Sequence, residues 1–181
     1  AENDYISGKL CFMLNLGLAT PAWFQNLDSD QYPVPSSSHS VVYASEVRCD
    51  GSLLEGAFFT NDTSQCKERP SHKYNGILCE ECGTMDPDYT CQEEDGYYLI
   101  GSWDDLYWFS HQVNSGNNAI NAKLTADIDN FTLKMMMQSY HGKFDGNGHR
   151  ITLNIENYDN FSAIFHTVEA DAEVSNLVVD G

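Results

Sequence analysis

The sequence has few cations and no long hydrophobic run. Nine Lys and Arg residues stand against 27 Asp and Glu residues in a chain of 181, so the formal charge is −18. Nucleic acid binding depends on clustered cations that neutralise phosphates, and no nucleic acid partner is therefore expected. The most apolar stretch, Leu10–Ala19, contains Asn15 and is shorter than the roughly 20 residues that cross a bilayer. Direct membrane insertion is not expected within this segment.

The chain also lacks common catalytic motifs. It contains no His-Glu-x-x-His pair and no Gly-x-Ser-x-Gly turn. Asp127 and Asp129 have a spacing compatible with a glycosidase pair or a calcium site, but a solvated strand edge that leads into a turn is the preferred explanation, since no matched acid lies nearby. Asn26, Asp28 and Asp30 resemble half of a calcium loop without its Gly and Glu. We expect no enzyme, no catalytic residue and no calcium site.

Six cysteines are present, which is typical of a secreted protein rather than a cytosolic one of this size. The sharpest local pattern is Cys66-x5-His72-x6-Cys79-x2-Cys82. Four soft or borderline ligands at such spacing predict a closed, structural zinc site. The alternative is that Cys66, Cys79, Cys82 and Cys91 pair in disulfides and leave His72 at the surface. The spacing leaves both readings open.

The remaining two cysteines, Cys11 and Cys49, are the best candidates for a separate disulfide; two buried thiols are the alternative.

Three segments differ in composition. Residues 1–60 predict a small α+β module, with a short helix over Ser7–Asn15 for which Ser7 serves as N-cap. Residues 61–95 are polar, rich in Cys and without a regular apolar pattern. Because such a segment buries little apolar surface, we expect zinc or disulfides to stabilise it. Its end is predicted to be a linker to the third segment. Residues 96–181 carry the regular elements.

The third segment predicts a strand and then a helix. Tyr97–Ile100 has the composition of a strand. Ser102 and Asp105 have the spacing of a capping box, with Asp in place of the usual Glu or Gln. Leu106, Phe109 and Val113 recur at helical spacing behind it. We expect a helix that ends near Val113.

Short apolar alternations then recur along the chain. They are Leu124/Ala126/Ile128, Ile151/Leu153/Ile155 and Leu177/Val179, and their first members are 27 residues (124 to 151) and 26 residues (151 to 177) apart. A strand at a near-constant step predicts stacked solenoid coils, and the preceding helix would cap the first coil. The expected fold is mostly β with minor α: an irregular Cys-rich α+β N-terminal region, then the helix-capped start of a right-handed parallel β-helix.

Several blocks occur in an order that resembles a known repeat family. They are Tyr97–Ile100, Leu106–Phe109, Val113–Gly116, Ala122–Asp129 and Gly142–His149. Together they resemble secreted and surface bacterial proteins with GLUG-type β-solenoid repeats, adhesin-like proteins common in gut Bacteroidetes and Firmicutes. The resemblance implies an extracellular or cell-surface location and a non-enzymatic module of a larger protein, with a role in adhesion or display. Its partner would be a host or bacterial surface protein or a glycan.

Two other functions stay open. Exposed aromatic side chains would favour a glycan-binding module, with or without calcium, and the candidates are Trp103, Tyr107 and Trp108. The third hypothesis is a fragment of a solenoid hydrolase or of a protease, which would need convergent carboxylates in a groove.

Overall fold

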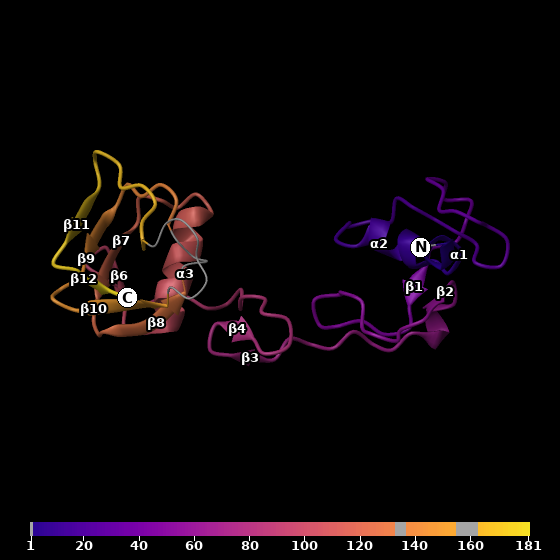
Figure 1. The fold of residues 1–181 in the computed structure, drawn as a ribbon, viewed down its shortest axis with the longest axis horizontal. Coiled ribbons are helices and arrows are strands. Elements are labelled where there is room, and N and C mark those ends of the chain that lie inside the picture. Colours follow the sequence, from indigo (N-terminus) through magenta and orange to yellow (C-terminus); the bar gives the residue numbers. More distant parts are fainter. Residues whose placement is uncertain (1, 133–136, 155–162) are drawn as a thin grey trace. The chain divides into compact units, whose positions relative to one another are not determined.

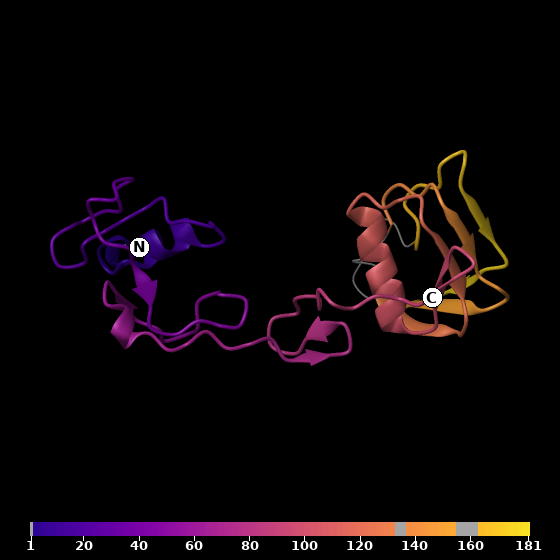
Figure 2. The same ribbon diagram turned by 180° about the vertical axis from the view of Figure 1, so that it is seen from behind.

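The computed structural model describes residues 2–132, 137–154 and 163–181. It divides the chain into two compact units, Ala1–Met85 and Asp86–Gly181, which are called the N-terminal and C-terminal units below (Figures 1 and 2). None of the helices in the described residues has the length and apolar character that crossing a membrane requires.

The N-terminal unit consists of short elements joined by long irregular segments. Its helices are α1 (Glu2–Ile6), α2 (Lys9–Asn15) and the 3-10 turn η1 (Thr63–Gln65). Its strands form two antiparallel pairs, β1 (Tyr43–Ala44) with β2 (Phe59–Thr60) and β3 (Tyr74–Asn75) with β4 (Leu78–Cys79). Regular hydrogen bonding therefore accounts for little of this unit.

The first helix prediction is corrected at its start. Gly8, and not Ser7, is the N-cap of α2, and its φ of 86° lies in the left-handed region. A Cβ atom at Gly8 would lie 2.6 Å from the Leu27 side chain and 2.9 Å from that of Val42. The chain thus turns sharply at a buried position that only glycine fits, so the predicted helix is confirmed as α2 but begins at Lys9, and α1 precedes it.

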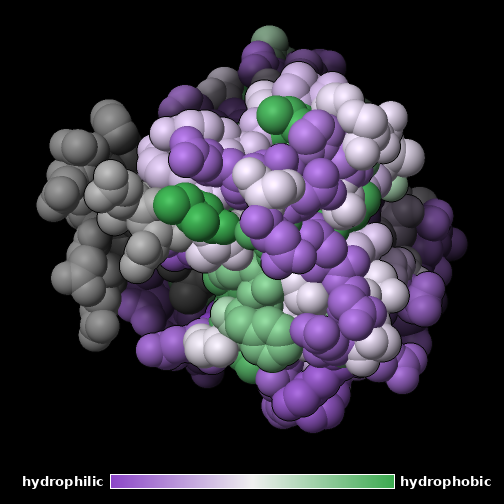
Figure 3. Space-filling view, turned by 90° about the vertical axis from the view of Figure 1, so that its right-hand side faces the viewer, coloured by the Kyte–Doolittle hydropathy of each residue, from purple (hydrophilic) through white to green (hydrophobic). Residues whose placement is uncertain are grey.

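The N-terminal unit has a small apolar core. Its buried apolar residues are Cys11, Val42, Ala44, Cys49, Ile77 and Cys79. Larger apolar side chains such as Ile6, Leu18 and Phe58 are about half exposed, at 55%, 48% and 54%. Figure 3 shows such apolar groups at the surface among hydrophilic ones. So small a core needs further support, and part of it comes from Asn61, which bonds the backbones of Gln25, Leu27 and Val41.

The C-terminal unit is built on parallel strands. They are β6 (Tyr97–Ile100), β7 (Asn121–Leu124), β8 (Ile128–Thr132), β9 (Lys143–Asp145), β10 (Arg150–Asn154), β11 (Glu173–Ser175) and β12 (Val178–Asp180), with β5 (Glu93–Glu94) as an antiparallel neighbour of β6. They form one sheet in the order β11-β9-β7-β6-β5 and another in the order β12-β10-β8. The prediction of a mostly β chain with few helices is confirmed.

Successive strands alternate between these two sheets. β7, β9 and β11 pair in parallel in one sheet, and β8, β10 and β12, each the next strand along the chain, pair in parallel in the other. Two isolated parallel bridges, Met137 to Phe165 and Tyr140 to Val168, form a third set of parallel contacts. In the described residues, later segments of the chain therefore pair with earlier ones at three places: the two sheets and this set of bridges.

The predicted repeat is corrected in its register. Leu124 closes β7 in one sheet, whereas Ile151 lies in β10 of the other and pairs with Ile128 and Val179. The equivalent positions are 23 residues (128 to 151) and 28 residues (151 to 179) apart. The alternation Leu124/Ala126/Ile128 is not one strand, because a bend separates β7 from β8. Ile155 lies outside the described residues.

The predicted helix of this unit is confirmed as α3 (Trp103–Asn114). The Ser102 Oγ accepts a hydrogen bond from the Asp105 N–H, and the Asp105 carboxylate accepts bonds from the Ser102 hydroxyl and the Gly101 N–H. Phe109 on its buried face contacts the rings of Tyr140 and Phe144, at centroid distances of 6.1 and 5.9 Å. The helix therefore packs on residues from two later parts of the repeat.

Candidate metal centre

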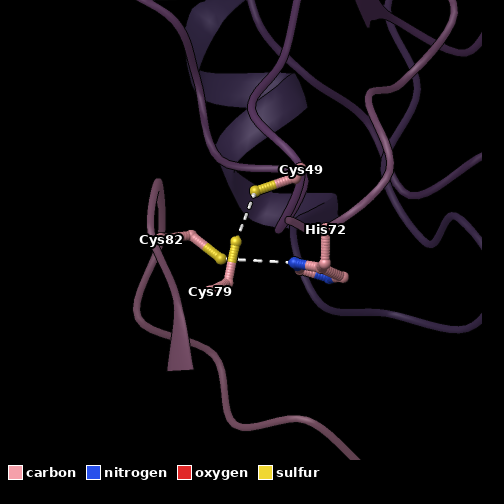
Figure 4. Close-up of side chains that lie close together, drawn as sticks. All are labelled: Cys49, His72, Cys79 and Cys82. Atoms are coloured by element: carbon pink, nitrogen blue, oxygen red, sulfur yellow. Dashed lines mark hydrogen bonds between the residues drawn. The ribbon is translucent and has the colours of Figure 1, made fainter. Parts of the chain in front are cut away.

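A tight turn after β4 places two cysteines together. The Cys79 N–H donates to the Thr84 carbonyl at 2.9 Å, and the Gly83 N–H donates to the Cys79 carbonyl at 2.8 Å. Gly83 has a φ of 71°, which a residue with a side chain rarely adopts. Cys79 and Cys82 thus lie on one short loop with their sulfur atoms on the same side, as in a Cys-x-x-Cys metal knuckle (Figure 4).

A second turn supplies Cys49. Val47 and Leu53 pair across it, and the Arg48 N–H donates to the Ser52 carbonyl at 2.9 Å. The Cys49 carbonyl accepts a hydrogen bond of 2.8 Å from the Arg69 Nε. The backbone on both sides of Cys49 is therefore fixed, and its side chain is directed at the β4 loop (Figure 4).

The fourth member is His72, from the segment that leads into β3. Its ring stacks on Tyr74 at a centroid distance of 5.6 Å. Its Nδ1 lies 3.4 Å from the Cys82 Sγ, while the Sγ atoms of Cys49 and Cys79 are 3.7 Å apart. The four ligand atoms all lie within 4.8 Å of one another.

These separations fit a shared cation. Zn–S bonds of about 2.3 Å and Zn–N bonds of about 2.0–2.1 Å in a tetrahedron place two sulfurs about 3.8 Å apart and a sulfur and a nitrogen about 3.6 Å apart. The observed 3.7 and 3.4 Å are close to both values. A disulfide would instead need sulfurs about 2.05 Å apart, and all six cysteines are free thiols in the structure. The four side chains can thus hold one metal ion.

The thiols of the site differ in acidity. Burial opposes ionisation of Cys79, but the N–H groups of Glu81 and Cys82 and the ring of His72 outweigh it and lower the pKa of Cys79 to about 6. Burial, together with the neighbouring Cys82 and Cys79, raises the pKa of Cys49 well above its ordinary value. Burial and the neighbouring thiols thus oppose ionisation of Cys49, and a bound cation would favour its thiolate form.

The predicted ligand set is corrected at one position. The structure brings His72, Cys79 and Cys82 together as expected, but Cys49 takes the place predicted for Cys66. Cys66 follows η1, and its Sγ lies 3.9 Å from the Asp62 carbonyl oxygen. It is outside the cluster because the η1 turn directs it back onto its own segment.

For the remaining pair the structure shows the alternative of two buried thiols and no disulfide. Cys11 is a buried thiol on α2 and is not bonded to Cys49, which belongs to the candidate metal cluster. Cys91 is buried in the C-terminal unit, where its Sγ lies 3.5 Å from the Asp105 carbonyl oxygen. Burial raises the pKa of both thiols.

The remaining candidates lie in the C-terminal unit. Trp108 is buried at 7% exposure, while Trp103 and Tyr107 are half-buried and stack on each other at 4.9 Å. Asp127 is engaged by His149 and the Arg150 N–H, and Asp129 by the Thr152 hydroxyl. These two carboxylates join neighbouring strands.

Comparison with known proteins finds no matching family model, curated protein or solved structure.

Proposed function

We propose that the chain is a non-enzymatic extracellular module of a bacterial surface or secreted protein, in which structural zinc holds the N-terminal unit and a parallel β-helix forms the C-terminal unit. The convergence of Cys49, His72, Cys79 and Cys82 within 4.8 Å carries the proposal. The role of the module is adhesion or display.

The donor set supports zinc over other cations. Three thiolates and one imidazole suit Zn²⁺, whereas Ca²⁺ and Mg²⁺ take oxygen ligands. Four protein ligands leave no position for water or substrate, so the ion would be structural. In such sites the apparent binding free energy, about 10–16 kcal/mol, contributes to folding. A unit with so few large buried side chains is the kind that needs it.

The parallel ladders support the β-helix. β7, β8 and the Met137–Tyr140 segment are followed in the same order by β9, β10 and the Phe165–Val168 segment. Right-handed winding is the rule for parallel crossover connections, and we extend it to this unit. A stack of coils gives an elongated surface, which suits display.

The display role comes from the resemblance to GLUG-type repeat proteins and from the same repeated architecture. The corresponding test is a turnover assay on glycans and peptides beside a binding panel of extracellular proteins. Binding without turnover is expected. Hydrolysis that disappears in Asp127→Asn or Asp129→Asn would replace the proposal with a hydrolase.

Glycan binding is the second candidate, and the half-exposed stack of Trp103 on Tyr107 favours it, because aromatic faces stack on sugars. A glycan array with the wild type and Tyr107→Ala separates the two. Selective glycan binding that Tyr107→Ala abolishes would support a lectin.

The zinc site is tested by metal analysis of the purified chain. One zinc per chain is expected, with Cys11, Cys66 and Cys91 as free thiols. Cys49→Ser should lose zinc and the matched Cys66→Ser should keep it. The reverse result, or metal-free protein with a Cys49–Cys79 disulfide, would contradict the site.

A further inference from the structure

The N-terminal unit contains an open hollow of about 600 Å³ outside the candidate metal cluster. It is called the apolar hollow below, and all the residues that line it lie between Phe12 and Arg69, within this one unit. Its walls come from the end of α2 with the loop behind it, from β1, and from the turns that carry Gly51 and Cys66. Sites for small molecules are typically concave, mostly apolar and of this size. Most of the lining side chains are apolar, among them Phe12, Leu16, Leu18, Pro21, Val41 and Val47.

The loop behind α2 is held in place by one side chain. The Asn15 side chain accepts hydrogen bonds from the N–H groups of Ala22 and Trp23, at 2.9 and 3.0 Å, and donates to the Trp23 carbonyl at 2.7 Å. These bonds close the loop that carries Leu16 and Leu18, which are 42% and 48% exposed. The apolar wall is therefore preformed, and a ligand would bind without first ordering it.

One cation lies among the apolar side chains of the hollow. Of the residues that line it, Arg69 alone is basic. The Arg69 Nε donates to the Cys49 carbonyl at 2.8 Å, which holds the guanidinium beside Gly51. Within the described part of the chain, no ion pair and no other hydrogen bond engages this guanidinium. Both Nη groups of Arg69 can thus bind an anion.

Asp50, the acid that lines the hollow, is engaged elsewhere. Its carboxylate accepts a hydrogen bond of 2.8 Å from the Ser52 N–H. Hydrogen bonds from Ser52 and the charge of Arg48 hold the pKa of Asp50 below its ordinary value, so this carboxyl is ionised at neutral pH without the help of Arg69. In a chain with 27 acids and 9 Lys and Arg residues, a guanidinium that has no acid partner beside an apolar surface suits an anion from outside the chain.

We propose that the apolar hollow binds a small amphipathic carboxylic acid of the medium-chain fatty acid type, with its carboxylate on the Nη groups of Arg69 and its apolar body against Leu16, Leu18 and Val41. A guanidinium binds a carboxylate through two parallel hydrogen bonds, which the two Nη groups can donate. The proposal concerns a ligand of the N-terminal unit, and neither the display role nor the β-helix enters it.

The probes are octanoate and octan-1-ol, which have the same chain length and differ in the charged group. Binding of each to the full chain is measured by isothermal titration calorimetry. Octanoate should bind saturably. Octan-1-ol should bind at least about tenfold more weakly, because it lacks the carboxylate that Arg69 would hold.

Cys66 reports where the probe binds, because its half-buried free thiol lines the same hollow. Alkylation by N-ethylmaleimide, followed by mass spectrometry of the peptides, measures the reactivity of each thiol. Octanoate should slow the alkylation of Cys66 in step with the fraction of chain that has bound it. The reactivity of Cys91, which lies in the C-terminal unit, should not change.

Two matched pairs of variants test the contacts. Arg69→Gln should weaken octanoate binding about tenfold, whereas Lys9→Gln removes a cation that does not line the hollow and should leave binding unchanged. Leu18→Asp should abolish binding, while Ile6→Asp, at a position that is 55% exposed and outside the hollow, should not. Thermal unfolding and metal content show whether each variant keeps its fold and its metal site, since Arg69 also bonds the Cys49 carbonyl.

The wild type alone decides the charge requirement, even if Arg69→Gln does not fold. Equal binding of octan-1-ol, no saturable binding of octanoate, or unchanged binding in a folded Arg69→Gln would overturn the proposal. Binding that leaves Cys66 fully reactive would also overturn it, because the ligand would then lie elsewhere. Self-association of the chain that Leu18→Asp abolishes would identify a second copy as the occupant instead.

Discussion

Among single residues, Asp127 links two neighbouring strands through one carboxylate. One oxygen accepts bonds from the Arg150 N–H and from the His149 ring, both at 3.0 Å. These partners, the Arg150 N–H first, hold the pKa of Asp127 below its ordinary value of 3.8. A carboxyl whose pKa is lower in the folded state stabilises the fold above its unfolded pKa, and the contribution disappears as the pH falls through the folded value.

Asp127→Asn should therefore lower the stability of the C-terminal unit at neutral pH, by a small amount because the side chain is exposed. The difference from wild type should shrink as the pH falls below about 4. Thermal unfolding from about pH 7 to about pH 3 measures it. Glu94→Gln removes the same charge from β5 and should show no such pH dependence. If the difference in stability between Asp127→Asn and the wild type stayed constant down to the lowest pH, the ionised carboxylate would not be its cause.

Phe144 is one of the large, fully buried side chains of the C-terminal unit. It is 1% exposed and contacts Phe109 at 5.9 Å and Phe165 at 5.4 Å. Phe144→Ala should lower the free energy of unfolding by about 3–5 kcal/mol in a denaturant titration. The matched Val178→Ala, at an outward and exposed position, should change it by less than about 0.5 kcal/mol. Similar losses for both would mean that the core is not where the structure places it.

Three of the four side chains in the candidate metal site could be predicted from the sequence, and the fourth could not. Cys79 and Cys82 share one turn, and His72 is close to them in the chain, so their spacing is informative. Cys49 is 23 residues from His72 (49 to 72), and only tertiary folding brings the two together. The turn at Cys49 and Gly51 was the available signal for this fourth side chain, because a Cys followed closely by Gly is compatible with a metal-binding turn. Cys66 has a suitable spacing, but η1 directs it elsewhere.

At the scale of elements, α3 depends on its first turn. The Ser102 hydroxyl caps the Asp105 N–H at 3.2 Å and donates to the Asp105 carboxylate at 2.7 Å. Ser102→Ala should lower the free energy of unfolding by about 1 kcal/mol, because the N–H loses its partner. Ser115→Ala, at the other end of the helix, is the matched control and should be nearly neutral. Denaturant titration of both variants measures the difference, and equal effects would contradict a capping role.

Elements with local signals could be predicted, and those set by the fold could not. α3 has an N-cap and a helical spacing of apolar residues, and β6 has the composition of a strand. Each of these signals lies within a few residues. The strands of the repeat are too short for that. β7 and β8 are joined by a bend whose half-buried Ala126 continues the apolar alternation, so two strands resemble one. Only the pairing of Ile128 with Ile151 reveals which strands are equivalent.

At the scale of the whole molecule, the two units are stabilised differently. The C-terminal unit buries large side chains, among them Phe109, Phe131, Tyr140 and Phe144. In the N-terminal unit two of the few buried apolar residues, Cys49 and Cys79, belong to the candidate metal site. The first unit should therefore depend on a bound metal, and the second should not.

Removal of the metal should unfold the N-terminal unit alone. Hydrogen exchange read by mass spectrometry distinguishes the units, because peptides from residues 1–85 and 86–181 are separated. A strong chelator should bring the first set to rapid exchange and leave the second protected, since loss of about 10–16 kcal/mol exceeds the stability of so small a unit. Cys49→Ser should reproduce the chelator effect without chelator, and Cys66→Ser should not. Phe144→Ala should raise exchange in the second set only. If the chelator left residues 1–85 protected, apolar burial and hydrogen bonds such as those of Asn61 would suffice to hold that unit, and the ligand cluster would be dispensable for its fold.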